Sequence, residues 1–143
     1  MSTHAEPLVP GDPTATAEVR SSMPFAELCG IVIDSTGPDE VIGRVRWRHE
    51  YCTVNGNLHG GHLMSLADAV GAWLAVQHLP EGAGTSTISS STNFLRPAPE
   101  ADYTIRSTLV MAGRRTITVV TDVVNPAGKV VSRTTQTQAV LTA

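Results

Sequence analysis

The sequence predicts an α+β fold in which an antiparallel sheet wraps around one long central helix. Residues 60 to about 79 show a helical pattern that is apolar or small on nearly every side, which is typical of a helix enclosed by other elements. Two segments with β-branched residues and alternation precede this helix, and four follow it. The 143 residues suffice for one domain with a real core and are too few for two.

Residues 1 to about 20 are rich in Pro, Thr and Ala and show no periodicity. Such a segment buries too little apolar surface to order itself, so we expect a flexible tail over 1–20 and the folded domain over 21–143. The segment also lacks the basic start and apolar block of a signal peptide. Cys29 and Cys52 have neither the number nor the spacing of a disulfide framework, so we expect a protein of the reducing cytoplasm.

Local signals predict the remaining elements. A short helix is expected over 21–30, with Ser22 as its cap, Pro24 in its first turn and Gly30 as its stop. The next segments, "GIVIDS" and "EVIGRVRWRH", predict a hairpin that turns at Gly37–Pro38. The strands after the long helix are expected in meander order, with the sequences "TSTISSSTNFL", "DYTIRSTLVMA", "RRTITVVTDVVN" and "KVVSRTTQTQAVLT".

Charge and composition exclude several classes of partner. The net charge is -3 and no run of Lys or Arg appears, which argues against nucleic acid. The most apolar stretch is interrupted by Asp68, so we expect no membrane span. The histidines lack a spacing with Cys, Asp or Glu that suits metal binding, and we expect no metal.

Three motifs and the order of the elements resemble the hotdog-fold acyl-CoA thioesterases of the phenylacetate-pathway and 4-hydroxybenzoyl-CoA type. The motifs are "LHGGHLMSLAD" at 58–68, "NFLRPA" at 93–98 and "GRR" at 113–115, and the resemblance covers roughly residues 24–141. It depends mostly on the HGG motif followed by an acidic residue on the helix. The resemblance implies a hotdog fold, homodimers that often pair into homotetramers, an acyl-CoA at the subunit interface, and no cofactor beyond the CoA of the substrate itself.

Thioester hydrolysis needs a base or nucleophile, and donors for the oxyanion that develops on the carbonyl. Gly60 and Gly61 open the long helix, where N–H groups lack partners and the missing side chain lets a bulky substrate approach. We therefore predict the Gly60 N–H as oxyanion donor and Gly61 as a contact of the CoA substrate. Asp68 is the only carboxylate between Glu50 and Glu81, which makes it the predicted base or nucleophile.

The helix itself separates these two groups. Eight residues between Gly60 and Asp68 correspond to about 12 Å along the axis, so the carboxylate cannot reach a carbonyl at its own helix start. Two antiparallel copies related by a two-fold axis bring Asp68 of one chain to Gly60 of the other and make two equal sites. Close approach of the two helices is favoured by small residues, Ala67, Gly71, Ala72 and Ala75.

Structural alternatives stay open for these residues. Asp68 has the alternative of a structural hydrogen bond to a backbone donor or strand hydroxyl, and the two glycines have that of a tight loop-to-helix junction. His59 is a site candidate that supports the loop through a hydrogen bond more readily than it transfers a proton. Predicted contacts of the CoA phosphates, or else solvated surface residues, are Arg96, Arg114 and Arg115.

The chain departs from the family in the loop before the helix. The family commonly has Asn or Gln six residues before the HGG histidine, touching substrate or water, whereas this chain has Thr53. Asn55 is our candidate replacement, with Thr53 and Asn57 as alternatives. Thr87 matches a position where some members place a hydroxyl on the attacking water, and an ordinary strand threonine is the alternative reading.

We therefore predict an acyl-CoA thioesterase whose acyl group, aryl or fatty, the sequence leaves open. A second hypothesis is a non-catalytic acyl-CoA-binding hotdog protein such as a ligand sensor. The intact spacing from HGG to Asp68 and the lack of a DNA-binding segment argue against it. A hotdog hydratase requires an Asp and a His in a different spacing, which this sequence lacks.

Overall fold

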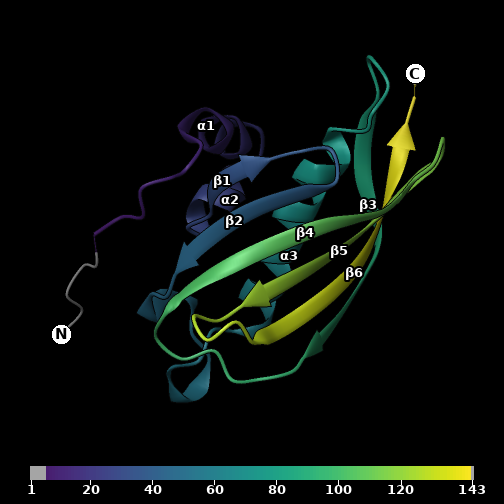
Figure 1. Cartoon of the computed structure of the whole chain (residues 1–143). Coiled ribbons are helices and arrows are strands. Elements are labelled where there is room, and N and C mark those ends of the chain that lie inside the picture. The colour runs from purple at the N-terminus through teal and green to yellow at the C-terminus, as the bar shows by residue number, and fades with distance from the viewer. Residues whose placement is uncertain (1–5, 143) are drawn as a thin grey trace.

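The computed structural model describes residues 6–142 and contains a six-stranded antiparallel sheet curled around one long helix (Figure 1). The helices are α1 (Pro13–Ser22), α2 (Pro24–Leu28) and α3 (Gly60–Val76). The strands are β1 (Val32–Thr36), β2 (Glu40–Arg46), β3 (Gly84–Phe94), β4 (Asp102–Ala112), β5 (Thr116–Val124) and β6 (Val130–Leu141). Between β2 and α3 the chain forms two short 3-10 turns, His49–Tyr51 and Val54–Gly56. The predicted α+β class is confirmed.

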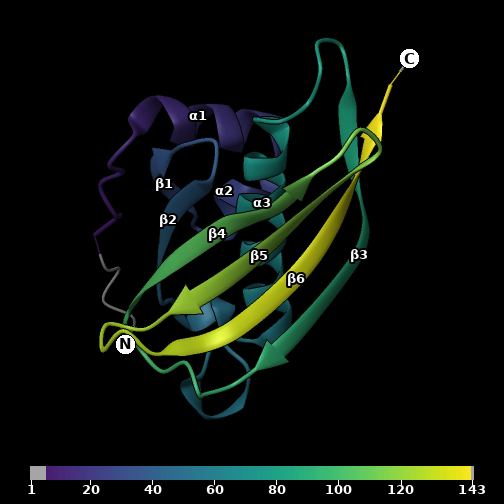
Figure 2. The same ribbon diagram turned by 45° about the vertical axis from the view of Figure 1, so that its right-hand side comes forward.

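Helix α3 lies in the concave face of the sheet and contacts β2 to β6 (Figure 2). Its side toward the sheet is fully buried, with Leu66, Val70 and Leu74 each 0 % exposed. Burial is not complete around the helix, because Met64 and Asp68 lie on an exposed side. Neither α3 nor another helix within residues 6–142 is long and apolar enough to cross a bilayer.

The sheet order is β1-β2-β4-β5-β6-β3, so the predicted meander of four strands is wrong for β3. This strand pairs with β6 at the sheet edge, with Thr87 opposite Gln138, and not with β4. The loop from 95 to 101 crosses from β3 at one edge to β4, which pairs with β2. Alternation along a segment identifies a strand but carries no information about its neighbour, which depends on pairing between distant residues.

The predicted hairpin of β1 and β2 is confirmed, and so is the short helix, with a shifted start. Ser22 ends α1 and does not cap α2, whose cap position is occupied by Met23 without a side-chain hydrogen bond. Gly30 has a φ of 80°, a conformation that glycine adopts without strain, and ends the helical segment as expected.

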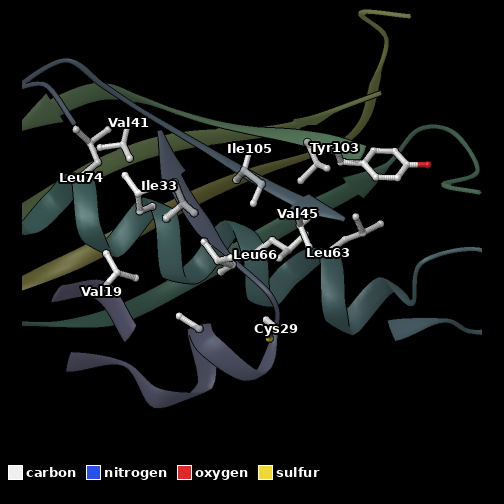
Figure 3. Close-up of a cluster of buried hydrophobic side chains, with 14 of the residues drawn as sticks. Val19, Cys29, Ile33, Val41, Val45, Leu63, Leu66, Leu74, Tyr103 and Ile105 are labelled. Carbon is white, nitrogen blue, oxygen red and sulfur yellow. The ribbon is translucent and has the colours of Figure 1, made fainter. Parts of the chain in front are cut away.

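The prediction of a flexible tail over 1–20 is wrong for residues 13–20, which belong to α1 and contribute to the core; residues 1–5 lie outside the described chain. Asp12 caps α1 by accepting a hydrogen bond from the Ala15 N–H at 3.0 Å. Val19 is 1 % exposed and packs in the main hydrophobic cluster with Ile33 (Figure 3). The helical pattern of α1 was not recognised in the sequence because the segment is rich in proline and threonine and because only one narrow side of the helix, with Ala15, Thr16 and Val19, is buried.

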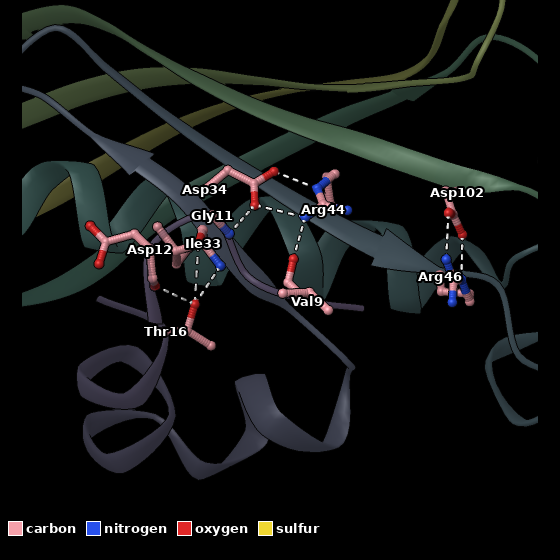
Figure 4. Close-up of polar contacts among 9 residues, drawn as sticks. All are labelled: Val9, Gly11, Asp12, Thr16, Ile33, Asp34, Arg44, Arg46 and Asp102. Carbon is pink, nitrogen blue, oxygen red and sulfur yellow. Dashed lines mark hydrogen bonds and ion pairs between the residues drawn. The ribbon is translucent and has the colours of Figure 1, made fainter. Parts of the chain in front are cut away.

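Polar contacts hold the chain before α1 against the first hairpin (Figure 4). The Gly11 N–H donates to Asp34 Oδ1 at 2.8 Å, and Arg44 donates to the Val9 carbonyl at 2.7 Å. Arg44 also pairs with Asp34, and this hydrogen bond is the main cause that lowers the pKa of the Asp34 carboxyl. The folded domain therefore begins before residue 21.

We predict that Val19→Ala lowers the free energy of unfolding by about 1 to 3 kcal/mol, because it removes buried methyl groups and leaves a cavity. Urea unfolding measures the change. Glu18→Gln, an exposed substitution on the same helix, is the matched control and should change stability by less than about 0.5 kcal/mol. Equal stabilities of the two variants would show that α1 does not belong to the cooperative core.

Candidate active site

Asp68 projects from the exposed side of α3 beside β3, where neutral donors hold its carboxylate. Its Oδ1 accepts a hydrogen bond from Thr87 Oγ1 at 2.9 Å and a second one from Gln136 Nε2. Gln138 Nε2 donates in turn to Thr87 Oγ1 at 2.8 Å. The structure thus brings two predicted site residues, Asp68 and Thr87, into direct contact and adds two glutamines to them.

The surroundings of Asp68 differ from those of the aspartates that form salt bridges. Arginines pair with Asp34, Asp102 and Asp122. No salt bridge of Asp68 occurs within residues 6–142. A carboxylate that neutral donors orient and no cation neutralises is arranged as a general base would be.

The start of α3 presents one free backbone donor. His59 is the cap residue, and its Nδ1 accepts a hydrogen bond from the Gly61 N–H at 2.8 Å. The Gly60 N–H has no acceptor among the described residues. An unpaired N–H at the positive end of a helix dipole is suited to a developing oxyanion. The cap uses the Gly61 amide, and the roles of His59 and Gly61 toward substrate stay predictions.

The loop before α3 is anchored by an aromatic stack. The rings of Tyr51 and His62 lie 4.2 Å apart at 12°, and the His59 N–H donates to the Tyr51 carbonyl at 2.8 Å. His62 Nε2 lies 3.0 Å from the Cys29 carbonyl, and burial lowers the pKa of the His62 imidazole. These contacts fix the position of the helix start. No cluster of three or more potential metal ligands occurs in the described chain.

Asn55 lies exposed in the second 3-10 turn with a φ of 62°. Asn adopts this left-handed conformation more readily than most non-glycine residues, so the local backbone by itself explains an asparagine at position 55. No hydrogen bond joins its side chain to Gly60 or Asp68 within the described chain. The Thr53 N–H donates to the Asn57 carbonyl at 2.8 Å and tightens the same loop. The contact of Asn55 with substrate stays a prediction.

The candidate arginines lie at two ends of β3. Arg114 and Arg115 are exposed in the β4–β5 turn, and the Arg115 carbonyl accepts from the Val140 N–H at 2.8 Å, close to where β3 begins. Arg96 follows the end of β3, and its Nη1 donates to the Val130 carbonyl at 2.7 Å. The structure therefore does not gather the three side chains into one cluster.

Sequence reasoning missed Phe94 at the helix start. A Cβ placed on Gly60 would lie 3.2 Å from Phe94 Cζ, so the aromatic ring covers the glycine, and Phe94 is 52 % exposed. A half-exposed ring beside the proposed oxyanion donor is available to pack on a substrate. No local pattern pointed to this contact, because β3 and α3 meet only in the folded chain.

Sequence reasoning also missed Gln136 and Gln138, which are each 1 % exposed. A signal existed: the buried face of β6 carries polar residues at every second position, namely Thr134, Gln136 and Gln138. Polar residues on the apolar side of an alternating strand are uncommon unless hydrogen bonds satisfy them.

We predicted that small residues on α3 allow the close approach of a second copy of this helix. This prediction is wrong for Ala67, Gly71 and Ala75. Their burial within one chain shows that they face their own sheet. A Cβ on Gly71 would lie 2.3 Å from Gln136 Oε1. Small size at these positions therefore serves the packing of α3 against the strands and does not indicate a second helix.

The chain matches the family model described as Thioesterase superfamily over residues 55–132 and belongs to that superfamily. Its fold is the hotdog fold of these thioesterases. No match is found among curated proteins. The predicted resemblance is thus confirmed at the level of the superfamily.

Solved structures with the same fold include three relatives. A thioesterase from Haemophilus influenzae is 26 % identical, with a TM-score of 0.78 and 82 % of each chain covered. A phenylacetic acid degradation-related protein from Ralstonia eutropha is also 26 % identical, with a TM-score of 0.78, 87 % of this chain and 98 % of that chain covered. A mutant of the phenylacetic acid degradation protein PaaI from Thermus thermophilus is 29 % identical, with a TM-score of 0.74 and coverage of 81 % and 97 %.

Proposed function

We propose that the protein is an acyl-CoA thioesterase that hydrolyses aryl- or fatty acyl-CoA to the free acid and CoA. The observation that carries the proposal is the exposed Asp68 carboxylate, bound by Thr87 and Gln136 and unmatched by a cation. Membership in the Thioesterase superfamily supports the reaction class. The phenylacetic acid degradation proteins among the structural relatives favour an aryl group.

The proposed reaction uses one carboxylate and one backbone donor. Asp68 takes a proton from water, whose oxygen attacks the thioester carbonyl, or attacks the carbonyl itself as nucleophile. The Gly60 N–H donates to the oxyanion, a contribution of about 3 kcal/mol for a well-placed donor. Collapse of the tetrahedral intermediate breaks the carbon–sulfur bond. In the base route the proton held by Asp68 passes to the CoA sulfur, and the free acid leaves. In the nucleophile route CoA leaves as the thiolate and takes a proton from solvent, and water then hydrolyses the acyl anhydride on Asp68 to the free acid. Thr87 orients the carboxylate or the water.

We also propose a homodimer, with dimers pairing into a tetramer. Gly60 and Asp68 lie eight residues apart on α3, about 12 Å along the axis, so one chain does not complete a site. Strand β3 is an exposed sheet edge, and the exposed side of α3 next to it carries Met64 and Asp68. A second chain can occupy this region and bring its own Gly60 to Asp68.

The two-fold arrangement also concerns the CoA contacts. Within one chain the turn with Arg114 and Arg115 lies at the start of β3, whereas Gly60 lies beside Phe94 at its end. An antiparallel second chain reverses this direction, so its turn lies toward the Gly60 end. We propose these arginines, with Arg96 and Gly61, as contacts of CoA. No further cofactor is proposed, and the two free cysteines support the cytoplasm as the proposed location.

The double variant Arg114→Gln/Arg115→Gln should raise KM for acyl-CoA about tenfold or more and leave KM for the matching N-acylcysteamine thioester unchanged, because only CoA carries phosphates. Steady-state kinetics on both substrates measure the difference. Arg96→Gln is tested in parallel to show which end of β3 contacts CoA. An equal effect of the double variant on both thioesters would point to folding and not to recognition.

Asp68→Asn should lower kcat/KM for the best acyl-CoA at least about a hundredfold, because it removes the base and keeps the volume and the acceptor for Thr87. A panel of aryl and aliphatic acyl-CoA substrates identifies the best one first. Asp39→Asn, an exposed substitution elsewhere, is the control. If Asp68→Ala turned over substrate at a near wild-type rate, the non-catalytic acyl-CoA-binding hypothesis would replace the enzyme.

Mixed dimers test the site between two chains. Gly60→Pro removes the free N–H, and the preceding residue has a ψ of 139°, which proline requires of its neighbour. Mixing Gly60→Pro chains with Asp68→Asn chains should restore about one quarter of wild-type activity after exchange, since half the dimers are mixed and each has one intact site. Native mass spectrometry confirms the exchange.

A second mixture separates the two geometries. Wild-type chains mixed equally with chains that carry both substitutions should retain about one quarter of wild-type activity if each site uses two chains, because mixed dimers are then inactive. About one half is expected if each chain builds its own site. Activity of one half here, together with no restoration in the first mixture, would disprove the shared site.

A further inference from the structure

We infer that Gln136 on β6 is the positioning residue of Asp68, and that Gly71 on α3 provides the space for its amide. The inference rests on the proposed function, in which Asp68 is the reacting carboxylate. It adds a residue from a distant strand to a site that motifs place on the helix and β3.

The contacts of Gln136 converge on Asp68. Its Nε2 donates to Asp68 Oδ1 and lies 3.5 Å from the Asp68 carbonyl oxygen and 3.3 Å from Thr87 Oγ1. Gln136 is buried, with an exposed fraction of 1 %. A donor fixed in the interior thus binds one oxygen of the exposed Asp68 carboxylate and defines where that carboxylate lies.

The other end of the same amide has no partner. Gln136 Oε1 is buried and accepts no hydrogen bond from the described residues. A buried acceptor without a donor lowers stability, and a hydrocarbon side chain of equal length avoids this loss. Stability alone therefore does not explain a glutamine at this position, whereas a donor directed at Asp68 does.

Gly71 is a second residue that lowers stability and at the same time keeps the Gln136 amide in place. Glycine inside a helix lowers helix stability relative to alanine. A Cβ at this position would lie 2.3 Å from Gln136 Oε1 and 3.1 Å from Val119 Cγ2. Alanine would therefore displace the amide from beneath Asp68.

The arrangement orients the carboxylate without neutralising it. Both side-chain donors, Thr87 and Gln136, bind Oδ1, and Oδ2 accepts no hydrogen bond from the described residues, which leaves it available to substrate or water. A neutral amide restricts the rotation of the carboxylate and adds no positive charge that would compete for it. Gln138 acts one step further away, because it donates to Thr87 and not to Asp68.

The test is Gln136→Met, which keeps the length and removes the donor. We expect kcat to fall at least about tenfold with KM within about twofold, because misplacement of a reacting group affects the chemical step. The melting temperature should equal or exceed that of the wild type, because the unpaired acceptor is removed. A residue needed only for folding would lose stability and activity together.

Thr134→Val is the matched control. Thr134 lies on the same face of β6, is 0 % exposed and bonds with the Thr92 hydroxyl at 2.7 Å, without contact to Asp68. Its kcat should stay within about twofold of wild type. A fall in kcat equal to that of Gln136→Met would assign both effects to general packing and overturn the inference.

Gly71→Ala tests the same position without removing the amide, and decides the matter if Gln136→Met does not fold. It should lower kcat in the wild-type background and lower it by a clearly smaller factor in a Gln136→Ala background, where the added methyl group meets no amide and only the contact with Val119 remains. Equal losses in both backgrounds would overturn the inference.

The inference and the proposed function fail in different ways. If Gln136→Met keeps the wild-type kcat while Asp68→Asn is inactive, the inference is overturned and the proposed function stands. If Asp68→Asn is active, the proposed function itself is disproved.

Discussion

The burial of α3 in the concave face of the sheet is the constraint on which the other features depend. Leu66, Val70 and Leu74 are fully buried, and their packing sets the rotation of the helix about its axis. This rotation places Asp68 on the exposed side, next to β3, and Gly60 lies at the start of the same helix beside Phe94. The geometry of the candidate site is therefore a consequence of core packing.

The N-terminal helices extend this enclosure. Helix α1 packs on β1, and α2 contacts α3, so both lie away from β3 (Figure 1). The edge of β3 and the side of α3 with Met64 and Asp68 remain uncovered. The region open to a second chain is thus the region that holds the reacting carboxylate, which links the proposed dimer to the proposed chemistry.

A polar row inside the core links stability to the site. Gln136 and Gln138 occupy positions of β6 where an alternating strand would carry apolar residues, and their amides support Asp68 and Thr87. Polar groups in a core specify geometry at the expense of stability, and active sites are where such a compromise is expected.

The sequence by itself determined the features that depend on neighbours along the chain: the long apolar helix, the first hairpin, the strand segments, and the glycine pair that begins eight residues before Asp68. Only the tertiary structure decided the features that depend on distant residues. Local alternation does not specify pairing partners, so β3 lies beside β6 and the meander fails. The burial of α1 depends on a surface built by later residues, and Asp68 meets Gln136 across 68 positions of sequence, which no local pattern encodes.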